Sequence, residues 1–266
     1  MEKHWALITG ASSGIGYQYA RILASKGYDL VIVSNEEQAI VTCGEILTHE
    51  FTVSVLPLYM DLATIDAAEK LFRFCTDKNI EIDILINNAG MFSLGEIVDC
   101  PAIRNEKMLL LHMYTPTMLC YYFGGLMKKK QSGYILNMSS MAAWLTYSGI
   151  GLYAATKRYL KNFSRSLRTE LKDYGVSVTT LCPGAVATDL YNLPCHYQQL
   201  ALRLGIMMSP EKLAAKGIKA MFHHKAYLLP GTINYILLPF AKLIPLGLVH
   251  ILMRKSGLLP LTKFEK

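Results

Sequence analysis

The stretch TGASSGIG, residues 9–16, decides the fold that this 266-residue sequence predicts. It follows a short apolar run at 5–9 and opens a segment whose apolar residues recur at helical spacing. Gly10 permits a sharp turn, Gly14 lets backbone approach a pyrophosphate, and Gly16 lets the helix pack on the strand, while the helix N-terminus offers backbone N–H groups to phosphates. A plain structural turn is the alternative. The sequence therefore predicts a dinucleotide-phosphate site formed by Gly10, Ser12, Ser13, Gly14, Ile15 and Gly16.

Short apolar runs alternate with longer segments of helical period along the rest of the chain. This pattern is typical of a parallel sheet covered by helices on both faces, so we expect a doubly wound α/β fold of about seven strands, with residues 1–266 forming one domain. Right-handed crossovers would place the carboxyl ends of the strands at one edge, where a ligand crevice forms. The expected strands are 5–9, 28–34, 53–59, 82–87, 133–139 and 176–182, with a weaker one at 226–229. The expected helices are 15–26, 36–49, 64–79, 104–129, 153–174 and 210–222.

The composition excludes several classes of protein. Hydrophobic residues make up 52% of the chain and charged residues 18%, which provides material for a large core and argues against disorder. The net charge of +7 is modest, and the one basic cluster, at 128–130, lies where a helix should end and cations favour the helix dipole, so we expect no nucleic-acid partner. The six cysteines are far apart and form no C-x-x-C pair, so we expect reduced thiols and no metal site. Met1 leads directly into the first apolar run without a signal peptide, so we expect a cytoplasmic protein.

Tyr153, Lys157 and Ser140 have the chemistry needed to move a proton. Tyr153 and Lys157 lie four residues apart on one expected helix, so they share a face, and the ammonium should lower the pKa of the tyrosine. Ser140 follows the fifth expected strand. Both hydroxyls could donate hydrogen bonds to a carbonyl oxygen that gains negative charge, while the hydride must come from a cofactor. The alternative is one more aromatic and one more charge on a largely buried helix.

The spacing of the glycines, with three residues between the first two, resembles the T-G-x-x-x-G-I-G signature of the short-chain dehydrogenase/reductase family. Further segments follow in the order that the family has them: NNAG at 87–90, Ser140, Tyr153-x-x-x-Lys157, Pro183-Gly184 and Thr188. The resemblance spans residues 4 to 190.

This resemblance implies a role for each matching residue. Ser140, Tyr153 and Lys157 would be catalytic. Tyr153 and Lys157 would also contact the cofactor, where Lys157 would hold the nicotinamide ribose. The backbone at Val186 and the Thr188 hydroxyl would hold the carboxamide. The other cofactor contacts that it implies are Asp61 and Leu62 at the adenine, with Asn88, Ala89, Gly90, Pro183 and Gly184. It also implies a homodimer or homotetramer, in which the helices expected at 104–129 and 153–174 pair with those of a neighbour.

One position departs from the pattern of the family. The family usually has an asparagine in the helix after NNAG, where it bends the helix and helps to relay protons through water to the lysine. Alignment of residues 111–116, LHMYTP, puts His112 in its place. Histidine can also hydrogen-bond water and lysine, so His112 is a catalytic candidate. Two alternatives stay open: a different alignment, and a helix histidine with satisfied hydrogen bonds and no catalytic role.

The end of the second expected strand bears on the choice of cofactor. An acidic residue there usually binds the ribose 2′-OH of NAD(H), whereas an arginine suits the 2′-phosphate of NADP(H). Ser34 and Asn35 occupy that point and provide neither group. We expect both to contact the cofactor and favour NADP(H) over NAD(H), with Glu36, one residue further on, as the argument for NAD(H).

Residues 230–255 form an apolar tail that prolines and charged residues interrupt, so we do not expect a transmembrane span. The tail resembles that of one branch of the family, whose members commonly reduce lipophilic ketones. It could simply pack beside the substrate cleft. Residues 185–209, rich in Leu, Tyr and Met, would then form the lid over the substrate. The alternative is peripheral membrane contact through the tail and the cations near it, which are Lys242, Arg254, Lys255 and Lys263.

Together these features predict an NAD(P)-dependent oxidoreductase that interconverts a secondary alcohol and a ketone. We expect NADPH-dependent reduction of a lipophilic substrate in lipid metabolism, such as a 3-ketoacyl chain, a 3-ketosphingoid base or a steroid. One alternative is a reductase of a small polar carbonyl, such as a sugar or a quinone. The other is a cofactor-binding regulatory protein in which His112 marks lost catalysis.

Overall fold

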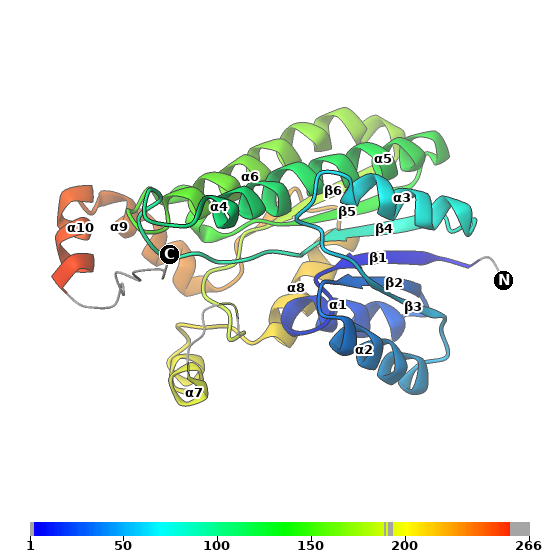
Figure 1. Cartoon of the computed structure of the whole chain (residues 1–266), viewed down its shortest axis with the longest axis horizontal. Helices are drawn as coiled ribbons and strands as arrows, with labels where there is room; N and C mark the ends of the chain where they lie inside the picture. Colours follow the sequence, from blue (N-terminus) through cyan, green and yellow to red (C-terminus); the bar gives the residue numbers. More distant parts are fainter. Residues whose placement is uncertain (1–2, 189, 191–193, 256–266) are drawn as a thin grey trace.

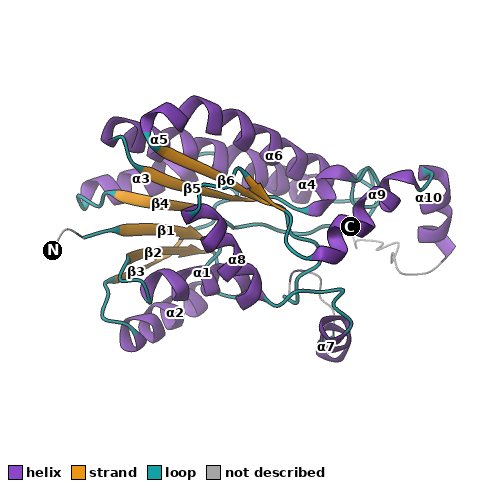
Figure 2. Ribbon diagram, turned by 180° about the vertical axis from the view of Figure 1, so that it is seen from behind, coloured by secondary structure: helices purple, strands orange, loops and turns teal. Residues whose placement is uncertain are grey.

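The computed structural model describes residues 3–188, 190 and 194–255, and a parallel sheet forms its centre. Within these residues seven strands follow the order β3-β2-β1-β4-β5-β6-β7, so the chain winds outward first from β1 and then from β4 (Figures 1 and 2). The doubly wound fold predicted from the sequence is confirmed. The strands are β1 Trp5–Thr9, β2 Asp29–Ser34, β3 Val55–Tyr59, β4 Ile82–Asn87, β5 Gly133–Met138, β6 Val176–Leu181 and β7 Tyr227–Leu228.

Helices cover both faces of this sheet (Figure 1). Successive side chains of a strand point to opposite faces, so Ala6 and Ile8 pack with helices of one layer and Leu7 with those of the other. Two apolar cores result, one on each side of the sheet. The first layer contains α1 (Gly14–Ala24), α2 (Glu37–Glu50) and α8 (Pro210–Phe222). The second contains α3 (Ala67–Asp77), α5 (Thr115–Lys130) and α6 (Gly151–Leu171), and α4 (Ala102–Leu109) packs against α6.

The ends of several predicted elements were wrong by a few residues. The strand predicted at 53–59 begins at Val55, because the Val53 N–H donates to the carbonyl of Phe51 and the Ser54 N–H to the Asp29 carboxylate, at 2.9 and 2.7 Å. These two donors therefore close a turn instead of joining the ladder. The helix predicted at 64–79 likewise begins only at Ala67.

The helix predicted at 104–129 was wrong as one regular helix, because a π-helical turn at Leu110–Tyr114 separates α4 from α5. Pro116 has no N–H to give to the carbonyl of His112, four residues earlier. The Thr115 N–H instead donates to the carbonyl of Leu110, five residues earlier. The proline thus accounts for a wide turn centred on His112.

Three further helices gather at the carboxyl edge of the sheet (Figures 1 and 2). The sequence did not predict α7 (Cys195–Arg203), which lies within the expected lid at 185–209; residues 189 and 191–193 of that lid are outside the described residues. The tail forms α9 (Thr232–Leu243) and α10 (Leu246–Lys255), which are separated at Ile244 because a residue before proline avoids helical geometry. None of the described helices is both long enough and apolar enough to cross a bilayer.

Candidate active site

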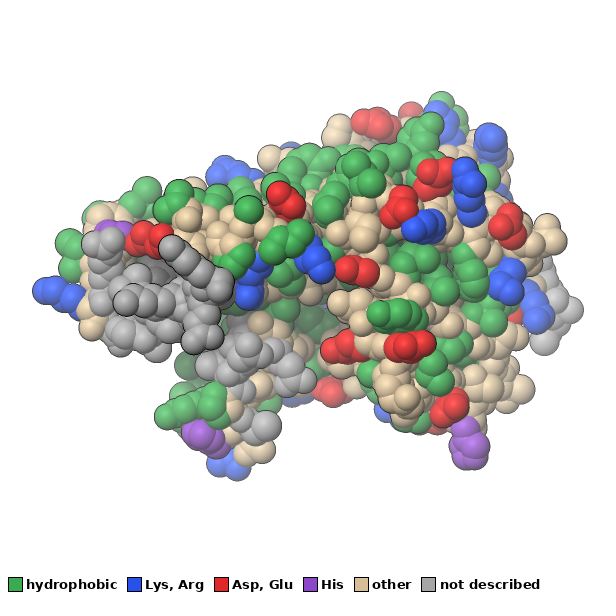
Figure 3. All heavy atoms as spheres, viewed as in Figure 1, with side chains coloured by type: hydrophobic (Ala, Val, Ile, Leu, Met, Phe, Trp, Pro, Cys, Tyr) green, Lys and Arg blue, Asp and Glu red, His purple; other side chains and the backbone are tan. Residues whose placement is uncertain are grey.

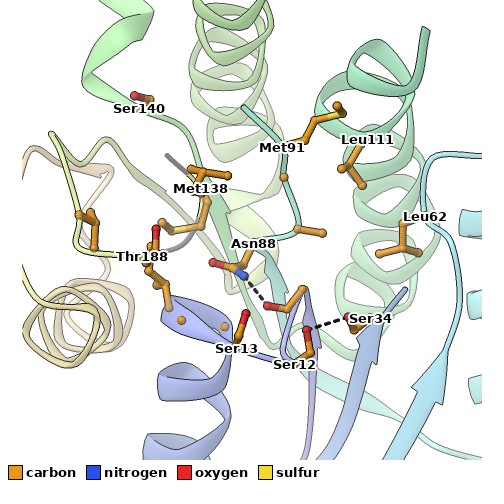
Figure 4. A pocket seen from close by; sticks show the side chains of 18 of the residues that line it. Ser12, Ser13, Ser34, Leu62, Asn88, Met91, Leu111, Met138, Ser140 and Thr188 are labelled. Atoms are coloured by element: carbon orange, nitrogen blue, oxygen red, sulfur yellow. Dashed lines mark hydrogen bonds between the residues drawn. The ribbon is translucent and has the colours of Figure 1, made fainter. Parts of the chain in front are cut away.

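A cavity of about 560 Å³ opens at the carboxyl edge of the sheet (Figure 4). The predicted catalytic residues Ser140, Tyr153 and Lys157 line it, whereas His112 does not. All the other residues predicted to contact the cofactor line it as well: Gly10, Ser12, Ser13, Gly14, Ile15, Gly16, Ser34, Asn35, Asp61, Leu62, Asn88, Ala89, Gly90, Pro183, Gly184, Val186 and Thr188. The fold thus brings together segments that are far apart in the sequence. Glu36, which the sequence offered as the argument for NAD(H), lines the cavity too, whereas sequence reasoning missed other lining residues, among them Met91, Lys107 and Leu111.

The glycine turn has the tight geometry that its sequence predicts. Gly10 and Gly14 have φ values of +66° and +54°, in the left-handed region that favours glycine. The Gly10 N–H donates to the carbonyl of Val33 at 2.8 Å, and the Asn88 side chain donates to the carbonyl of Gly10 at 3.0 Å. A Cβ on Gly16 would lie 1.9 Å from the Gly10 carbonyl oxygen. Gly16 is therefore required by contact with the turn itself, and not with the strand as we expected.

The first turn of α1 offers free donors to this cavity. Ser13 is the N-cap, but its side chain makes no capping hydrogen bond, and the first turn contains no acidic residue. Backbone N–H groups at a helix N-terminus carry partial positive charge and have no partner within the helix. This donor set fits the pyrophosphate of a dinucleotide.

A carboxylate lies at the end of β2, where the sequence left the choice of cofactor open. The Ser34 hydroxyl donates to Ser12 Oγ at 2.8 Å (Figure 4), and the Ser12 hydroxyl donates to Glu36 Oε2 at 2.7 Å. Ser34 Oγ also accepts the Glu36 N–H at 3.2 Å. Glu36 is thereby fixed in the cavity wall. The side chain of Lys107, also in this wall, is paired with Asp61, with 3.4 Å between Nζ and Oδ2.

Ser140, Tyr153 and Lys157 are buried beside one another, with 8%, 6% and 5% of their surfaces exposed. Ser140 Oγ accepts the Ala142 N–H at 3.1 Å, so its hydroxyl can still act as a donor, and it hydrogen-bonds the side chain of Tyr153. Lys157 Nζ donates to the carbonyl of Met138, at the end of β5, at 3.0 Å. Burial lowers the pKa of Lys157 to about 8, because an ammonium loses hydration there.

The expected effect of Lys157 on Tyr153 is not observed. Burial raises the pKa of Tyr153, and the neighbouring Ser140 hydroxyl offsets part of that rise. Lys157 Nζ lies 5.7 Å from the centre of the tyrosine ring. Sequence spacing placed the two residues on one face correctly, but it could not reveal the degree of burial. Phe92, which the sequence did not single out, packs edge-on against the Tyr153 ring at 5.1 Å.

His112 is buried, and both of its ring nitrogens are engaged. Nε2 accepts the Met91 N–H at 3.0 Å, so Nδ1 must carry the proton, and it lies 3.0 Å from Thr156 Oγ1. Thr156 in turn donates to the carbonyl of Tyr153 at 2.8 Å. Burial and the charge of Lys157 hold the pKa of His112 well below 6.5. His112 is therefore a neutral side chain that joins the loop after β4 to α6.

A second cavity, of about 400 Å³, adjoins the first and shares Pro183, Gly184 and Val186 with it. The rest of its wall comes from the end of α7 and the segment after it, the start of α8 and the start of α9. Most of these side chains are apolar, and they include Leu202, Ile206, Met207, Met208 and Ile233. This compartment suits an apolar group.

Comparisons with known proteins point to one family. Residues 4–193 match the family model of short chain dehydrogenases. The EphD oxidoreductase of Mycobacterium tuberculosis is 32% identical over 185 residues, which are 69% of this chain and 31% of that protein. The very-long-chain 3-oxoacyl-CoA reductase of Homo sapiens is 30% identical over 190 residues, 70% of this chain and 60% of the reductase. The chain thus spans less than two thirds of the length of these relatives.

Solved structures match nearly the whole chain. A short-chain dehydrogenase from Sphingobium yanoikuyae in complex with NADPH is 27% identical, with a TM-score of 0.77 and coverage of 95% of this chain and 96% of that one. The bulky-bulky ketone specific alcohol dehydrogenase from Comamonas testosteroni is 26% identical, with a TM-score of 0.75 and coverage of 95% and 94%.

Proposed function

Because this chain belongs to the short-chain dehydrogenase family and is an oxidoreductase, we propose that it reduces a lipophilic ketone to a secondary alcohol with a nicotinamide cofactor. The observation that carries this proposal is one cavity of about 560 Å³ that contains both the glycine turn and the side chains of Ser140, Tyr153 and Lys157. The turn and the first N–H groups of α1 would hold the phosphates of the cofactor. The cofactor, when bound, supplies the hydride.

The side chains of the chain itself supply the proton. The Ser140 hydroxyl, next to Tyr153, would donate a hydrogen bond to the substrate oxygen. Burial keeps Tyr153 protonated, and a neutral phenol is the form that gives a proton to an oxygen gaining negative charge during reduction. Lys157, which lines the same cavity, would hold the nicotinamide ribose. This division of roles suits reduction better than oxidation.

Substitution Tyr153→Phe tests the catalytic role. Turnover of a ketone, followed by the absorbance of NADH and NADPH across a panel of lipophilic and polar ketones, should fall by about 10²–10⁴-fold. Cofactor affinity, measured by fluorescence titration, should change little, and the exposed Tyr121→Phe should behave as wild type. Full turnover by Tyr153→Phe would show that the catalytic account is wrong. A wild-type protein that binds cofactor but reduces no ketone would favour the regulatory alternative.

His112 acts, in our proposal, as a positioning residue and not as a proton donor. Both ring nitrogens hold fixed partners, and the link through Thr156 ends on the backbone of Tyr153. A cavity of about 10 Å³, room for about one water, adjoins both His112 and Lys157. Asn87 also lines it, and its side-chain oxygen is buried without a hydrogen-bond partner among the described residues. A water in this cavity would let protons reach Lys157 without the histidine ring.

The choice between NAD(H) and NADP(H) depends, in our proposal, on Glu36. The sequence favoured NADP(H) because Ser34 and Asn35 carry no charge. A 2′-phosphate near Ser12 would meet the Glu36 carboxylate, 2.7 Å from the Ser12 hydroxyl, whereas a 2′-OH could donate to it. This geometry favours NAD(H), so we propose NAD(H) as the preferred cofactor in place of the NADP(H) that the sequence favoured.

A bulky apolar ketone is the substrate class that we propose. The second cavity, with its Leu, Ile and Met lining, adjoins the one that contains Ser140 and Tyr153. Two similar proteins are named for bulky or very long substrates, the human 3-oxoacyl-CoA reductase and the Comamonas alcohol dehydrogenase. The described part of 185–209, including α7, would cover this substrate as a lid. A substrate of this kind partitions into lipid, so we propose that the enzyme meets it at a membrane surface.

A further inference from the structure

Helices α9 and α10 leave an unusual amount of apolar surface uncovered. Phe240 and Leu243 on α9 are 64% and 77% exposed, and Ile236, Leu246 and Ile251 are at least half exposed. Single exposed apolar residues are ordinary, but contiguous apolar patches usually mark a contact site. Many apolar side chains of α9 and α10 therefore remain exposed to solvent instead of packing on the rest of the chain.

Helix α7 carries the same kind of surface at the same end of the molecule. Tyr197, Leu200 and Leu204 are 58%, 53% and 61% exposed. Figure 1 shows α7, α9 and α10 at the end of the molecule where the carboxyl edge of the sheet lies, with α7 projecting apart from α9 and α10, and Figure 3 shows apolar side chains on α7. Both segments contribute to the wall of the second cavity, and we call their described parts, within 190–209 and 230–255, the tail rim.

The charges of these two segments have one sign. Residues 190–209 and 230–255 contain no Asp or Glu. Lys255 is exposed at the end of α10. Lys263, which the sequence grouped with the tail, lies outside the described residues. The basic residues in the two segments are Arg203, Lys242, Arg254 and Lys255.

The tail rim is joined directly to the loop that precedes α6. The Tyr147 hydroxyl donates to the carbonyl of Ala241 at 2.5 Å, and Ser148 Oγ lies 3.1 Å from His250 Nδ1. Leu238 also packs in a small apolar cluster with Trp144. A force or ligand acting on α9 and α10 therefore acts on the segment between Ser140 and Tyr153.

We propose that the tail rim is a docking surface for an anionic lipid membrane. The protein would lie on one face of the bilayer without crossing it. Exposed apolar side chains on segments whose only charged residues are basic are a composition that binds anionic lipid interfaces. A second copy of the chain is a poorer occupant, because a symmetric contact would bring cations of one sign together. Docking itself does not depend on the enzymatic activity; only the delivery of a lipophilic ketone rests on the function proposed above.

Sedimentation of the full chain with lipid vesicles tests this proposal. Wild-type protein should bind phosphatidylcholine vesicles that contain phosphatidylglycerol, and pure phosphatidylcholine at least about tenfold more weakly. Added salt should weaken binding because it screens the charges. The double substitution Phe240→Ser/Leu243→Ser should reduce vesicle affinity by about tenfold or more. Ile46→Ser, at an exposed apolar residue of α2, should leave it unchanged.

Three outcomes would overturn the proposal. Wild-type protein could stay with the soluble fraction, or it could bind neutral and anionic vesicles equally. Light scattering could instead show that the double variant lowers the oligomeric state without any vesicle binding by wild type, in which case a second copy covers the tail rim. Turnover of a water-soluble ketone in the absence of vesicles is measured in parallel. If wild-type protein binds vesicles but does not reduce this ketone, the proposed function is contradicted and the docking proposal is not.

Discussion

The glycine turn and the tail rim lie at the same edge of the sheet but are built in opposite ways. Around the turn, backbone groups contact each other so closely that a Cβ at Gly16 would lie 1.9 Å from a carbonyl oxygen. In the tail rim, Leu243 is 77% exposed and contacts little of its own chain. Backbone geometry therefore allows few sequences in the glycine turn. In the tail rim, many sequences would fit as long as the exposed side chains stay apolar. In our proposals the first region holds the cofactor, and the second selects the substrate and the surface at which the enzyme acts.

Gly16→Ala should break the first region and cause the largest effect. The turn must shift to admit a Cβ, so the free energy of unfolding in urea should fall by about 1–3 kcal/mol and cofactor titration should show strongly weakened binding. Gly125 on α5 is the matched control, because a Cβ there would have no atom of the described residues within 4 Å beyond its own helix turn. Gly125→Ala should be neutral or stabilise by about 0.5–1 kcal/mol. Equal behaviour of the two variants would contradict the close packing of the turn.

Glu36→Gln tests the cofactor side of this comparison, because it should change the preference between NADH and NADPH without changing the fold. Removing the carboxylate removes its repulsion of a 2′-phosphate, so the ratio of kcat/KM for NADPH to that for NADH should rise by about tenfold. Glu37→Gln, at the next residue and at the start of α2, is the control and should leave the ratio unchanged. If Glu36→Gln leaves this ratio unchanged, Glu36 does not decide between NADH and NADPH.

His112→Asn tests the junction between the loop after β4 and α6. The pKa of His112 lies well below 6.5 in the folded protein, so below about pH 6.5 the unfolded chain takes up a proton that the folded one does not. The free energy of unfolding of wild type should therefore fall, relative to His112→Asn, as the pH drops below 6.5, and the two curves should run parallel above it. Parallel curves at every pH would show that the ring is not held neutral. Denaturant titrations over about pH 5 to 8 decide this.

Tyr147→Phe should have the smallest effect, because it removes one hydrogen bond between the tail rim and the loop before α6. The expected loss is about 1 kcal/mol of stability. We also expect a higher KM for a lipophilic ketone, with the KM for NADH unchanged. Tyr235→Phe, on the exposed side of α9, is the control. A raised KM for both substrates would mean that the hydrogen bond supports the whole cavity and not the substrate side.

Features governed by local rules were predictable from the sequence. The alternation of apolar runs and helical segments predicted the sheet, and the glycine spacing predicted the turn. Four-residue spacing placed Tyr153 and Lys157 on one helix face, and both line the cavity. The signal for the π-helical turn was also present, since Pro116 follows His112 by four residues, although we expected one regular helix there.

Features that depend on distant contacts were not predictable. The pKa of Tyr153 is set by burial among segments far away in the sequence, so the pairwise argument from Lys157 had the wrong sign. The direction of the Glu36 side chain depends on Ser12, 24 residues earlier. The contact of Tyr147 with the carbonyl of Ala241 joins residues 94 positions apart. No local pattern contains such information.

The small apolar cluster under α9 has a consequence for protein engineering. Its buried members are Cys182, Leu229 and Leu238, whereas the two main cores contain many more side chains and do not include the tail. The family match also ends at residue 193, before the tail begins. A designer could therefore exchange the chain after β7 between relatives as a cassette, provided that the small cluster and the loop contacts stay compatible, which would test whether the tail alone sets the surface on which the enzyme acts.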